Sequence, residues 1–484
     1  RKPCLLKTLS WLDRDNSVAV AMARSINVGY ARSSMDVLAS VADEVGIQVI
    51  LEGRDGDLIW ASRREDYFEC LQTAPPTQLI NRIPGMNVAC EKVTTHHALS
   101  NGCPLPFWPK SWAYTGSKPA KLAEHIFETL PPGKVVIVKP SKTAKGTGIA
   151  IASSKEELCK VLIGIPRCLR EAAGGQQDLL RVTDEAIVQH YIEPPLLLGG
   201  LKFDFRVYVF VCPADEQRQE IEELGPAFLC REGLARFSTK PYKALKDCKS
   251  DWTDAHLTNT SLSMSSESFE KSNDPDDGRQ GSKRKLSAVV ACLAEDGVIS
   301  VASFWKSVEI VVTTVLRRLS PSVYEASRSK DTYTRPPIPD VNWQSCLSMA
   351  QERFGQAFNL LGFDIMLNSH GEVFLLEVNA APSLAIEDIV PINNLAERAG
   401  PHTNSFRKRW AVYHDGADWG ERCRCPDHHT RHRHELSDVD HDVKSKVVQG
   451  VFRILAAREG GVRETAWSDG TLYSPLWSVP TKYL

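Results

Sequence analysis

The chain has 484 residues, and because a compact domain usually takes about 150, its length predicts about three packed units. Apolar residues make up 42% and charged residues 24%, which excludes a collagen-like, coiled-coil or wholly disordered chain. The 58 basic residues nearly cancel the 60 acidic ones, so no overall field draws the molecule to nucleic acid or to a membrane. No apolar run is long enough to cross a bilayer. We therefore expect neither partner.

The N-terminus and the cysteines bear on the cellular compartment. Charged residues at 13–15 interrupt the N-terminus before any apolar run, which predicts no signal peptide. The thirteen cysteines are odd in number, scattered and mostly inside apolar stretches. That usage is typical of reduced thiols and not of a disulfide framework, and it predicts a cytoplasmic location.

The first half of the chain changes pattern near residue 131. Residues 1–130 predict a small α/β lobe, in which short apolar runs separated by Gly and Pro end in a helical pattern over 121–130. Beyond them we expect a helix over 155–162 and a set of short strands, at 135–138, 148–152, 186–192, 204–212 and 227–237. We assign 131–195 to a central subdomain and 196–400 to a C-terminal subdomain.

The second half alternates structured and polar stretches. Residues 261–287 are rich in Ser, Asp and Gly and contain a Ser-Lys-Arg-Lys run, which predicts a flexible insertion. Helices are expected at 308–319 and 343–361, where apolar residues recur with a period of about 3.6. A strand pair is then expected at 363–367 and 373–378, joined by a turn at 368–371. A Cys/His/Arg-rich insertion, 401–442, and a C-terminal helix and tail, 443–484, complete the chain.

The predicted strand pair carries the most informative local pattern. Glu377 and Asn379 are two residues apart and so share one face of their strand, and the neighbouring strand can bring Asp364 beside them. Oxygen ligands of this kind suit Mg²⁺, which retains water and bridges to phosphates. The alternative is a strand-end acid and a surface charge, but Glu377 lies among apolar residues, where an unpaired carboxylate is unfavourable. We predict a metal site at these three residues.

A second strand pattern places charges of alternating sign on one face. In the segment 202–209, Lys202, Asp204 and Arg206 share a face, and apolar residues occupy the other. A solvated face held by mutual ion pairs explains this pattern as well as a binding surface does. On its own, the strand leaves both interpretations open.

The segment 139–149 predicts a strand, a glycine-containing loop and another strand. Gly146 and Gly148 allow backbone amides to approach an anion, and Lys139 and Lys145 add positive charge. It is not a Walker A loop, because a strand and not a helix follows. A phosphate cover and a simple hairpin turn are both compatible with it. The segments 230–237 and 256–259 set polar residues beside apolar anchors, and each alone predicts only a capped turn.

Taken together and in this order, these segments resemble the tubulin tyrosine ligase-like family of ATP-grasp ligases. The resemblance extends from about residue 57 to 383. It rests on nine segments, which are 79–86, 107–112, 139–149, 188–198, 202–206, 231–233, 256–259, 362–364 and 376–383. It implies an α/β (α+β) ATP-grasp fold with a small N-terminal lobe and with central and C-terminal ATP-grasp subdomains.

The resemblance also implies a chemistry, with ATP and Mg²⁺ as cofactors. ATP would phosphorylate a carboxylate to an acyl phosphate, an amine would attack, and an amide or isopeptide bond would form. Fixed cations and the metal would neutralise the phosphoryl charge. By similarity the residues that contact ATP would be Lys139, Lys145, Gly146, Thr147, Gly148, Ile149, Gln189, His190, Tyr191, Ile192, Lys202 and Asp204.

The same similarity assigns the remaining site residues. Arg206 and Arg231 would meet the amino-acid carboxylate or the acyl phosphate, with His256, Thr258 and Asn259 nearby. Lys145 stands where many family members carry Arg, a choice closer to tyrosine ligase itself. Because Lys supplies a point charge in place of a planar fork, the donor amino acid stays open.

The implied partner is tubulin, through its acidic C-terminal tails, with free glutamate as the donor. The implied location is the cytoplasm and the microtubule cytoskeleton, with the cilium or flagellum as one such place. Glycylation and tyrosination are alternatives within this class. A catalytically silent, microtubule-binding adaptor is the alternative from another class.

Basic and Cys/His-rich runs offer further possibilities. Residues 423–434 contain zinc-ligand types, but the paired spacing of zinc sites is absent, which favours a basic surface loop. This loop, with the runs at 407–409 and 282–285, has the charge to attract acidic tubulin tails. A solvated charge run is the alternative for each.

Overall fold

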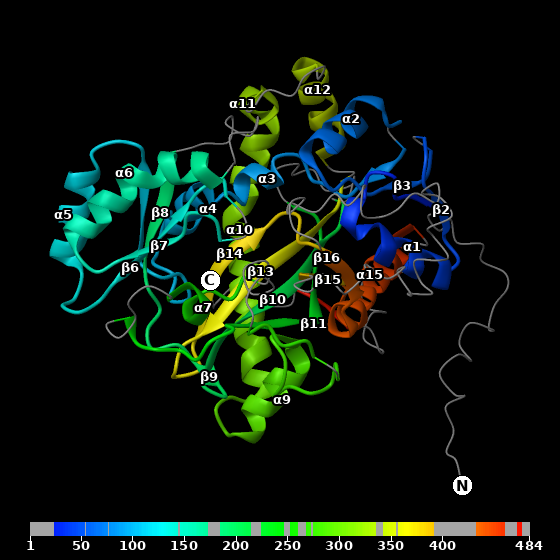
Figure 1. Cartoon of the computed structure of the whole chain (residues 1–484). Helices are drawn as coiled ribbons and strands as arrows, with labels where there is room; N and C mark the ends of the chain where they lie inside the picture. Colours follow the sequence, from blue (N-terminus) through cyan, green and yellow to red (C-terminus); the bar gives the residue numbers. More distant parts are fainter. Residues whose placement is uncertain are drawn as a thin grey trace, which may run out of the picture.

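A computed structural model provides the fold. It describes residues 24–53, 55–75, 77–143, 146–172, 184–213, 224–245, 252–259, 268–272, 274–334, 342–354, 357–391, 432–459 and 472–476. Three sheets of four or more strands are present in these ranges, each covered by helices (Figure 1).

The N-terminal lobe is built on a four-stranded parallel sheet of order β2-β1-β3-β4. Its strands are β1 (Ser25–Asn27), β2 (Gln48–Ile50), β3 (Leu58–Ile59) and β4 (Leu79–Ile80). Its helices are α1 (Met35–Glu44), α2 (Arg64–Thr73), α3 (Met86–Ala89) and α4 (Lys92–Ser100), and η1 (Arg32–Ser34) is a short 3-10 helix. Helix α1 buries Val37, Leu38 and Val41. Val41 follows the other two by four and three positions, about one helical turn, so the three form one apolar stripe.

The central sheet is antiparallel, with strand order β5-β8-β6-β7. Its strands are β5 (Ser111–Thr115), β6 (Val136–Pro140), β7 (Ala150–Ala152) and β8 (Glu185–His190). Helices α5 (Pro119–Thr129) and α6 (Lys155–Ala172) lie side by side on one face, where Val136, Val138 and Val188 pack beneath them (Figure 1). Because side chains alternate along a strand, Lys139 and Gln189 lie on the opposite face.

The large sheet is also antiparallel, and its main strand order is β12-β11-β10-β13-β14. These strands are β10 (Leu201–Val211), β11 (Ala227–Phe237), β12 (Lys283–Lys285), β13 (Asn359–Leu367) and β14 (Val373–Asn379). Two short strands, β9 (Leu197–Leu198) and β17 (Tyr473–Pro475), pair with β10 and β11.

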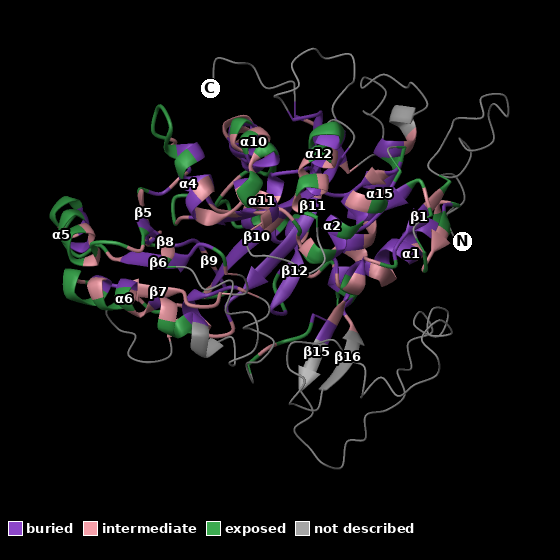
Figure 2. Cartoon of the chain, turned by 90° about the horizontal axis from the view of Figure 1, so that it is seen from above, coloured by how far each residue is buried: buried purple, intermediate pink, exposed green. Residues whose placement is uncertain are grey.

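Strand β10 is the centre of the large sheet and is buried along most of its length (Figure 2). One face, with Phe203, Phe205 and Val207, packs in a core that includes α9 (Leu286–Glu295) and α10 (Val301–Arg328). On the opposite face, Tyr208 and Phe210 pack in a second core, with α1 and α15 (Asp438–Glu459). The N-terminal half of that second face carries Lys202, Asp204 and Arg206. This half is therefore polar, whereas helices cover the other, apolar half.

The remaining elements are short. They are α7 (Trp252–His256), α11 (Lys330–Thr334), α12 (Trp343–Arg353) and the antiparallel strand pair β15 (Glu387–Pro391) and β16 (His432–Leu436). Among the described residues, no helix has both the length and the apolar character that a membrane span requires. The basic run 407–409 and residues 423–431, with most of the candidate zinc ligands, lie outside the described residues.

The helix expected over 343–361 is too long. Helix α12 ends at Arg353, and strand β13 begins at Asn359. All nine residues of β13 are buried. A strand that is buried on both faces is apolar at nearly every position, and over a short stretch it has no period that separates it from a buried helix.

The segment 261–287 was expected to be a flexible insertion with a solvated basic run, and the basic run is buried, not solvated. Residues 283–285 form strand β12 at the edge of the large sheet, and all three are buried. Arg284 lies 3.6 Å above the centre of the Phe237 ring, and Lys285 pairs with Asp276 and Asp442. The run is therefore not available to tubulin tails. Its acidic partners on α15 are about 150 residues away in sequence, so the local composition could not reveal them.

Lys283 is the centre of a buried charge cluster that joins β12, β15 and α15. Its ammonium contacts the carboxylates of Asp388 and Asp440, and Lys444 lies 2.6 Å from the other oxygen of Asp440. Burial alone would raise the pKa of Asp440, but the two ammonium groups outweigh it and hold that pKa well below its usual range. The ionised cluster fixes α15 against the large sheet.

Replacing Asp440 tests this cluster. Asp440→Asn leaves two buried ammonium groups with one carboxylate between them, and we expect a loss of about 3–5 kcal/mol in the free energy of unfolding. Asp438→Asn, at an exposed position of the same helix, is expected to cost less than about 1 kcal/mol. Denaturant titration measures both.

The same cluster predicts a pH dependence. Because the pKa of Asp440 is lower in the folded state, its contribution is present above the unfolded pKa of about 3.9 and is lost as the pH falls below it. The difference in stability between wild type and Asp440→Asn should therefore shrink as the pH drops from 6 to 3. A difference that does not change with pH would contradict an ionised Asp440.

Candidate active site

A cleft lies between the inner face of the central sheet and the polar half of strand β10. It encloses about 640 Å³, part of it open to solvent. The cleft is lined by Ile137, Lys139, Ile149, Gln189, His190, Tyr191, Ile192, Lys202, Asp204, Arg236, His256, Leu257, Thr258, Asn259, Asp364, Met366, Leu376 and Glu377. Thirteen of the residues predicted from the sequence are therefore gathered in one place, although they come from segments up to 238 positions apart.

The floor of the cleft is a ladder of alternating charges across three adjacent strands, defined by Asp204, Arg236, Asp364 and Arg206. Strand register sets it, because Asp204 lies opposite Arg236 and Arg206 lies opposite Asp364. Arg236 donates to both oxygens of Asp204, at 2.6 and 2.9 Å, and its other contact is to Asp364 Oδ2, at 2.9 Å. Arg206 donates to both oxygens of Asp364. Each buried charge is thus paired on the ladder.

The ladder controls the charge of Asp364. Burial alone would raise the pKa of this carboxyl, but Arg206 and Arg236 outweigh burial and hold the pKa well below its usual range. Asp364 is therefore ionised at every physiological pH. It can carry negative charge into the cleft without a metal ion being present.

The three predicted magnesium ligands meet at the end of this ladder. Asp364 lies opposite Glu377 and Gly362 opposite Asn379 in the β13–β14 pair. The amide Nδ2 of Asn379 lies 3.4 Å from Asp364 Oδ2 and 3.3 Å from Glu377 Oε1. The amide nitrogen of Asn379, not its oxygen, therefore faces the two carboxylates. The carboxylates suit a hard cation such as Mg²⁺, and Asn379 would supply an oxygen ligand with its amide group turned over. Among the described residues, no group of three or more His, Cys, Asp or Glu is placed to hold a metal ion, and the predicted set contains only two residues of these types.

Two buried lysines face this group across the cleft. The ammonium of Lys139 donates to Gln189 Oε1 at 2.9 Å, and Gln189 in turn donates to Ser111 Oγ. Burial lowers the pKa of Lys139 to about 8, although Glu377 raises it in part. Burial also lowers the pKa of Lys202 to about 7, against the opposing effect of Asp204. Both ammonium groups are poorly compensated and so are ready to accept an anion.

Lys202 belongs to a short hydrogen-bond chain. Its ammonium donates to Tyr191 Oη at 2.9 Å and to the backbone oxygen of His256 at 2.8 Å. Because the phenol oxygen accepts from Lys202, its own proton is directed to His256 Nδ1, 2.7 Å away. Burial lowers the pKa of His256 to about 4, so the ring is neutral and can accept this bond. His256 therefore orients Lys202 through Tyr191.

The remaining predicted residues take different places. Thr258 donates to Asp204 Oδ2 at 2.5 Å, and Asn259 lines the cleft. In the glycine loop only Ile149 lines it, while Gly146 and Gly148 have positive φ, which glycine adopts without strain. Thr147 is described but does not line the cleft. Lys145 lies outside the described residues.

Arg231 does not reach the cleft. Its guanidinium pairs with Glu309 of α10, donates to Ser474 Oγ at 2.9 Å and lies over the Trp305 ring. Strand alternation places Arg231 on the same face as Leu229 and Ala235, which packs in the core with α10, and not on the face that carries Arg236. The role expected for Arg231 by resemblance is not supported by this position.

Sequence reasoning missed Arg236, which stands in the cleft instead. A signal was present, because Arg236 lies between Ala235 and Phe237 in an apolar strand, where an unpaired cation is unfavourable. Only the pairing of β11 with β10 shows that its partner is Asp204.

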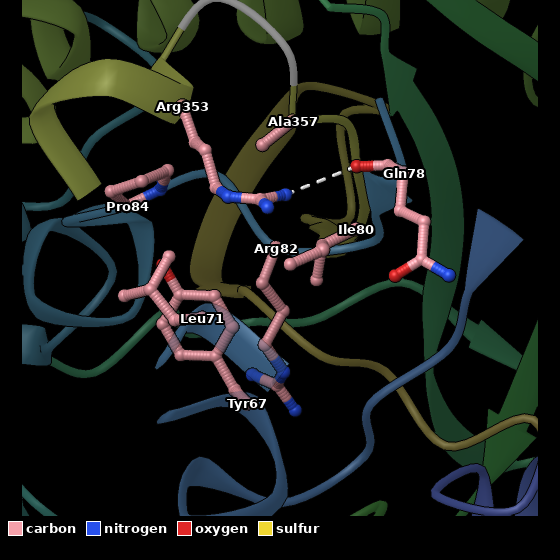
Figure 3. A pocket seen from close by; sticks show the side chains of 8 residues that line it. All are labelled: Tyr67, Leu71, Gln78, Ile80, Arg82, Pro84, Arg353 and Ala357. Carbon is pink, nitrogen blue, oxygen red and sulfur yellow. Dashed lines mark hydrogen bonds between the residues drawn. The ribbon is translucent and has the colours of Figure 1, made fainter. Parts of the chain in front are cut away.

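A second cavity has no comparable chemistry (Figure 3). It lies where the N-terminal lobe meets α12 and is lined by Tyr67, Leu71, Gln78, Ile80, Arg82, Pro84, Arg353 and Ala357. Its two arginines bind backbone: Arg353 donates to the oxygens of Gln78 and Ala74, and Arg82 to that of Ala61. No carboxylate lines this cavity, so its arginines act as a structural joint between the lobe and α12.

The part of the chain that forms the cleft matches a known protein family. The model of the "Tubulin-tyrosine ligase family" matches residues 71–393, about two thirds of the chain, and this range contains every residue of the cleft.

Individual relatives agree with the family match. The "Tubulin polyglutamylase ttll-11" of Caenorhabditis elegans is 31% identical over 76% of this chain and 47% of its own length. The human "Tubulin polyglutamylase TTLL6" is 28% identical over 69% of this chain and 32% of its own. A "Probable beta-tubulin polyglutamylase" of Tetrahymena thermophila is 27% identical over 70% and 24%. The chain thus spans between about a quarter and a half of the length of these relatives. Because the family model matches two thirds of its sequence, the chain belongs to the tubulin-tyrosine ligase family.

Proposed function

We propose that this chain is an ATP-dependent carboxylate–amine ligase that adds glutamate to tubulin. One observation carries the proposal: the carboxylates of Asp364 and Glu377 line the same cleft as Lys139, Lys202 and Arg236, and the Asn379 amide lies within 3.4 Å of both carboxylates. Phosphoryl transfer to a carboxylate requires this combination, because the metal and the fixed cations must together neutralise the moving phosphate.

Two ATP-binding regions are proposed within the cleft. Lys139 and Lys202 would hold the phosphates, with the loop that ends at Ile149 beside them. Gln189, His190, Tyr191 and Ile192, at the end of β8, would border the base. The two regions adjoin each other, because Lys139 donates to Gln189 Oε1 and Lys202 donates to Tyr191 Oη.

Mg²⁺ would be held by Asp364, Glu377 and Asn379, where it would supply charge neutralisation for the phosphoryl group. Arg206 and Arg236 keep Asp364 ionised and fixed in place. Asp204 pairs with Arg236 on the side away from Asp364, and this pairing holds the Arg236 guanidinium in the ladder. These residues bind and orient, and none needs to donate or accept a proton during phosphoryl transfer.

The reaction then proceeds in two balanced steps. A carboxylate oxygen of the acceptor forms a bond to the γ-phosphorus of ATP as the bond to the β-phosphate oxygen breaks, which releases ADP. The amine of the incoming amino acid then attacks the acyl carbon, phosphate leaves with the bonding electrons, and the amine loses a proton. An amide bond results.

Glutamate is proposed as the donor and tubulin as the acceptor because three separate relatives carry names that state this activity. The proposed place of action is the microtubule cytoskeleton. Glycine and tyrosine remain alternative donors. A silent adaptor is disfavoured, since an adaptor has no need for buried, poorly compensated lysines opposite a set of metal ligands.

Incorporation of labelled amino acids tests the proposal directly. Tubulin, ATP and Mg²⁺ are incubated with the protein and with radiolabelled glutamate, glycine or tyrosine. We expect label from glutamate alone, and only with ATP present. Label from another amino acid would change the donor, and no label from any of them, with nucleotide binding intact, would favour the adaptor.

Glu377→Gln tests the metal ligands. We expect turnover to fall at least about 100-fold, equivalent to ~2.7 kcal/mol, because one anionic ligand is removed while the shape is kept. The fold should be retained, since the Glu377 side chain is partly exposed. Glu372→Gln, at an exposed position of the same hairpin, is the control and should leave turnover unchanged. Equal turnover of the two variants would refute the metal assignment.

The pKa values of Lys139 and Lys202, about 8 and about 7, predict how ATP binding depends on pH. Only the protonated ammonium groups attract phosphate, and raising the pH above these values removes that charge. We therefore expect the affinity for ATP to fall at least about tenfold between pH 7 and pH 9, with proton uptake on binding. Isothermal titration in two buffers of different ionisation enthalpy measures both. An affinity that is constant over this range would mean that neither lysine titrates there.

A further inference from the structure

Lys92 links three parts of the molecule at the edge of the cleft. It is the first residue of α4 and so belongs to the N-terminal lobe. Its ammonium donates to the backbone oxygen of Thr143, at 2.8 Å, in the turn that follows β6 of the central sheet. The same ammonium lies 3.6 Å from Glu377 Oε2 on β14 of the large sheet.

Neighbouring contacts hold α4 in this position. The backbone N–H of Val93 donates to Ser141 Oγ at 3.3 Å, and Glu91 lies 3.9 Å from the ammonium of Lys142. The start of α4 therefore packs on the turn 141–143 through three consecutive residues. Of these three residues, Lys92 is the one whose side chain also reaches Glu377 on β14.

Glu377 needs such support because of its place in the sheet. Strand β14 is the last strand in the order of the large sheet, so it pairs with β13 on one side, and its backbone has a further bond from the N–H of Leu375 to the oxygen of Phe107, at 2.9 Å. Past its other side lie two lysines: Lys92 beside the Glu377 carboxylate, and Lys139, 3.5 Å from the backbone oxygen of Leu376. A ligand carboxylate holds its orientation when outer groups bind the oxygen that faces away from the metal.

We propose that Lys92 is a positioning residue for the reaction: from the N-terminal lobe, it orients the carboxylate of Glu377 and fixes the turn 141–143 against it. This inference rests on the proposed function, since it assigns to Glu377 the role of a metal ligand. Lys92 acts through Glu377 and Thr143. Its loss would leave the metal ligand on an edge strand without its charged neighbour.

The test separates positioning from folding and from the identity of the amino-acid donor. Binding of a fluorescent ATP analogue is measured at increasing Mg²⁺ for wild type, Lys92→Met and Lys142→Met. We expect Lys92→Met to require about 10- to 100-fold more Mg²⁺ for half-maximal binding, the range found when outer-shell partners of a metal site are removed. Lys142→Met is the matched control, because Lys142 lies on the same turn, is largely exposed and pairs with Glu91, not with Glu377.

Turnover gives the second readout. With saturating Mg²⁺ and varied ATP, the kcat of Lys92→Met should fall by a larger factor than the KM for ATP rises. Lys92→Arg should recover part of the lost kcat, because it restores the positive charge. Melting temperature without ligands checks the fold, and Lys92→Gln replaces Lys92→Met if the latter does not fold. An unchanged Mg²⁺ requirement in a folded variant would overturn the proposal, whatever happens to kcat. Failure of the proposed function gives a different result, because the wild type would then incorporate no glutamate. The Mg²⁺ requirement for nucleotide binding can still be compared between the wild type and Lys92→Met in that case.

Discussion

The structure depends on the pairing of four buried charges across neighbouring strands of the large sheet. Asp204, Arg236, Asp364 and Arg206 lie in a register that places each carboxylate against a guanidinium. Without its partners, each group would be strongly destabilising in this position. The pairing therefore fixes the relative positions of β10, β11 and β13, and it does so on the floor of the cleft. The same interactions that stabilise the sheet also prepare an ionised surface for a nucleotide and a metal.

Strand β10 shows how one strand serves both fold and site. Its apolar face is continuous and packs in a core that includes α9 and α10. Its second face is divided, because Tyr208 and Phe210 pack in the core of α15 and α1, while Lys202 and Asp204 line the cleft and Arg206 pairs with Asp364 beside them. The buried cluster around Lys283 fixes α15 to the large sheet. The cleft therefore begins on β10 where the cover of α1 and α15 ends.

Charge balance explains why this site suits an anionic substrate. Lys139 and Lys202 are buried where few carboxylates compensate them, and burial lowers the pKa of each. Keeping them charged is unfavourable until an anion enters, so a phosphate gains from both ammonium groups. On the far side, Glu377 and Asn379 extend the ladder toward solvent. Lys92 brings the N-terminal lobe to the same point, and the three parts of the molecule meet where the phosphoryl group would move.

The sequence by itself determined much of this protein, because strand periodicity places side chains on faces. It predicted that Glu377 and Asn379 share a face near Asp364, and that Lys202, Asp204 and Arg206 share another, and both groups lie together in the structure. It could not predict that Arg236 meets Asp204 in the cleft, since that depends on the register of β11 against β10. Nor could it show that residues 283–285 are buried, because their carboxylate partners on α15 are distant in sequence. Local spacing sets which way a side chain points, whereas only the packing of distant strands and helices decides which charge it meets.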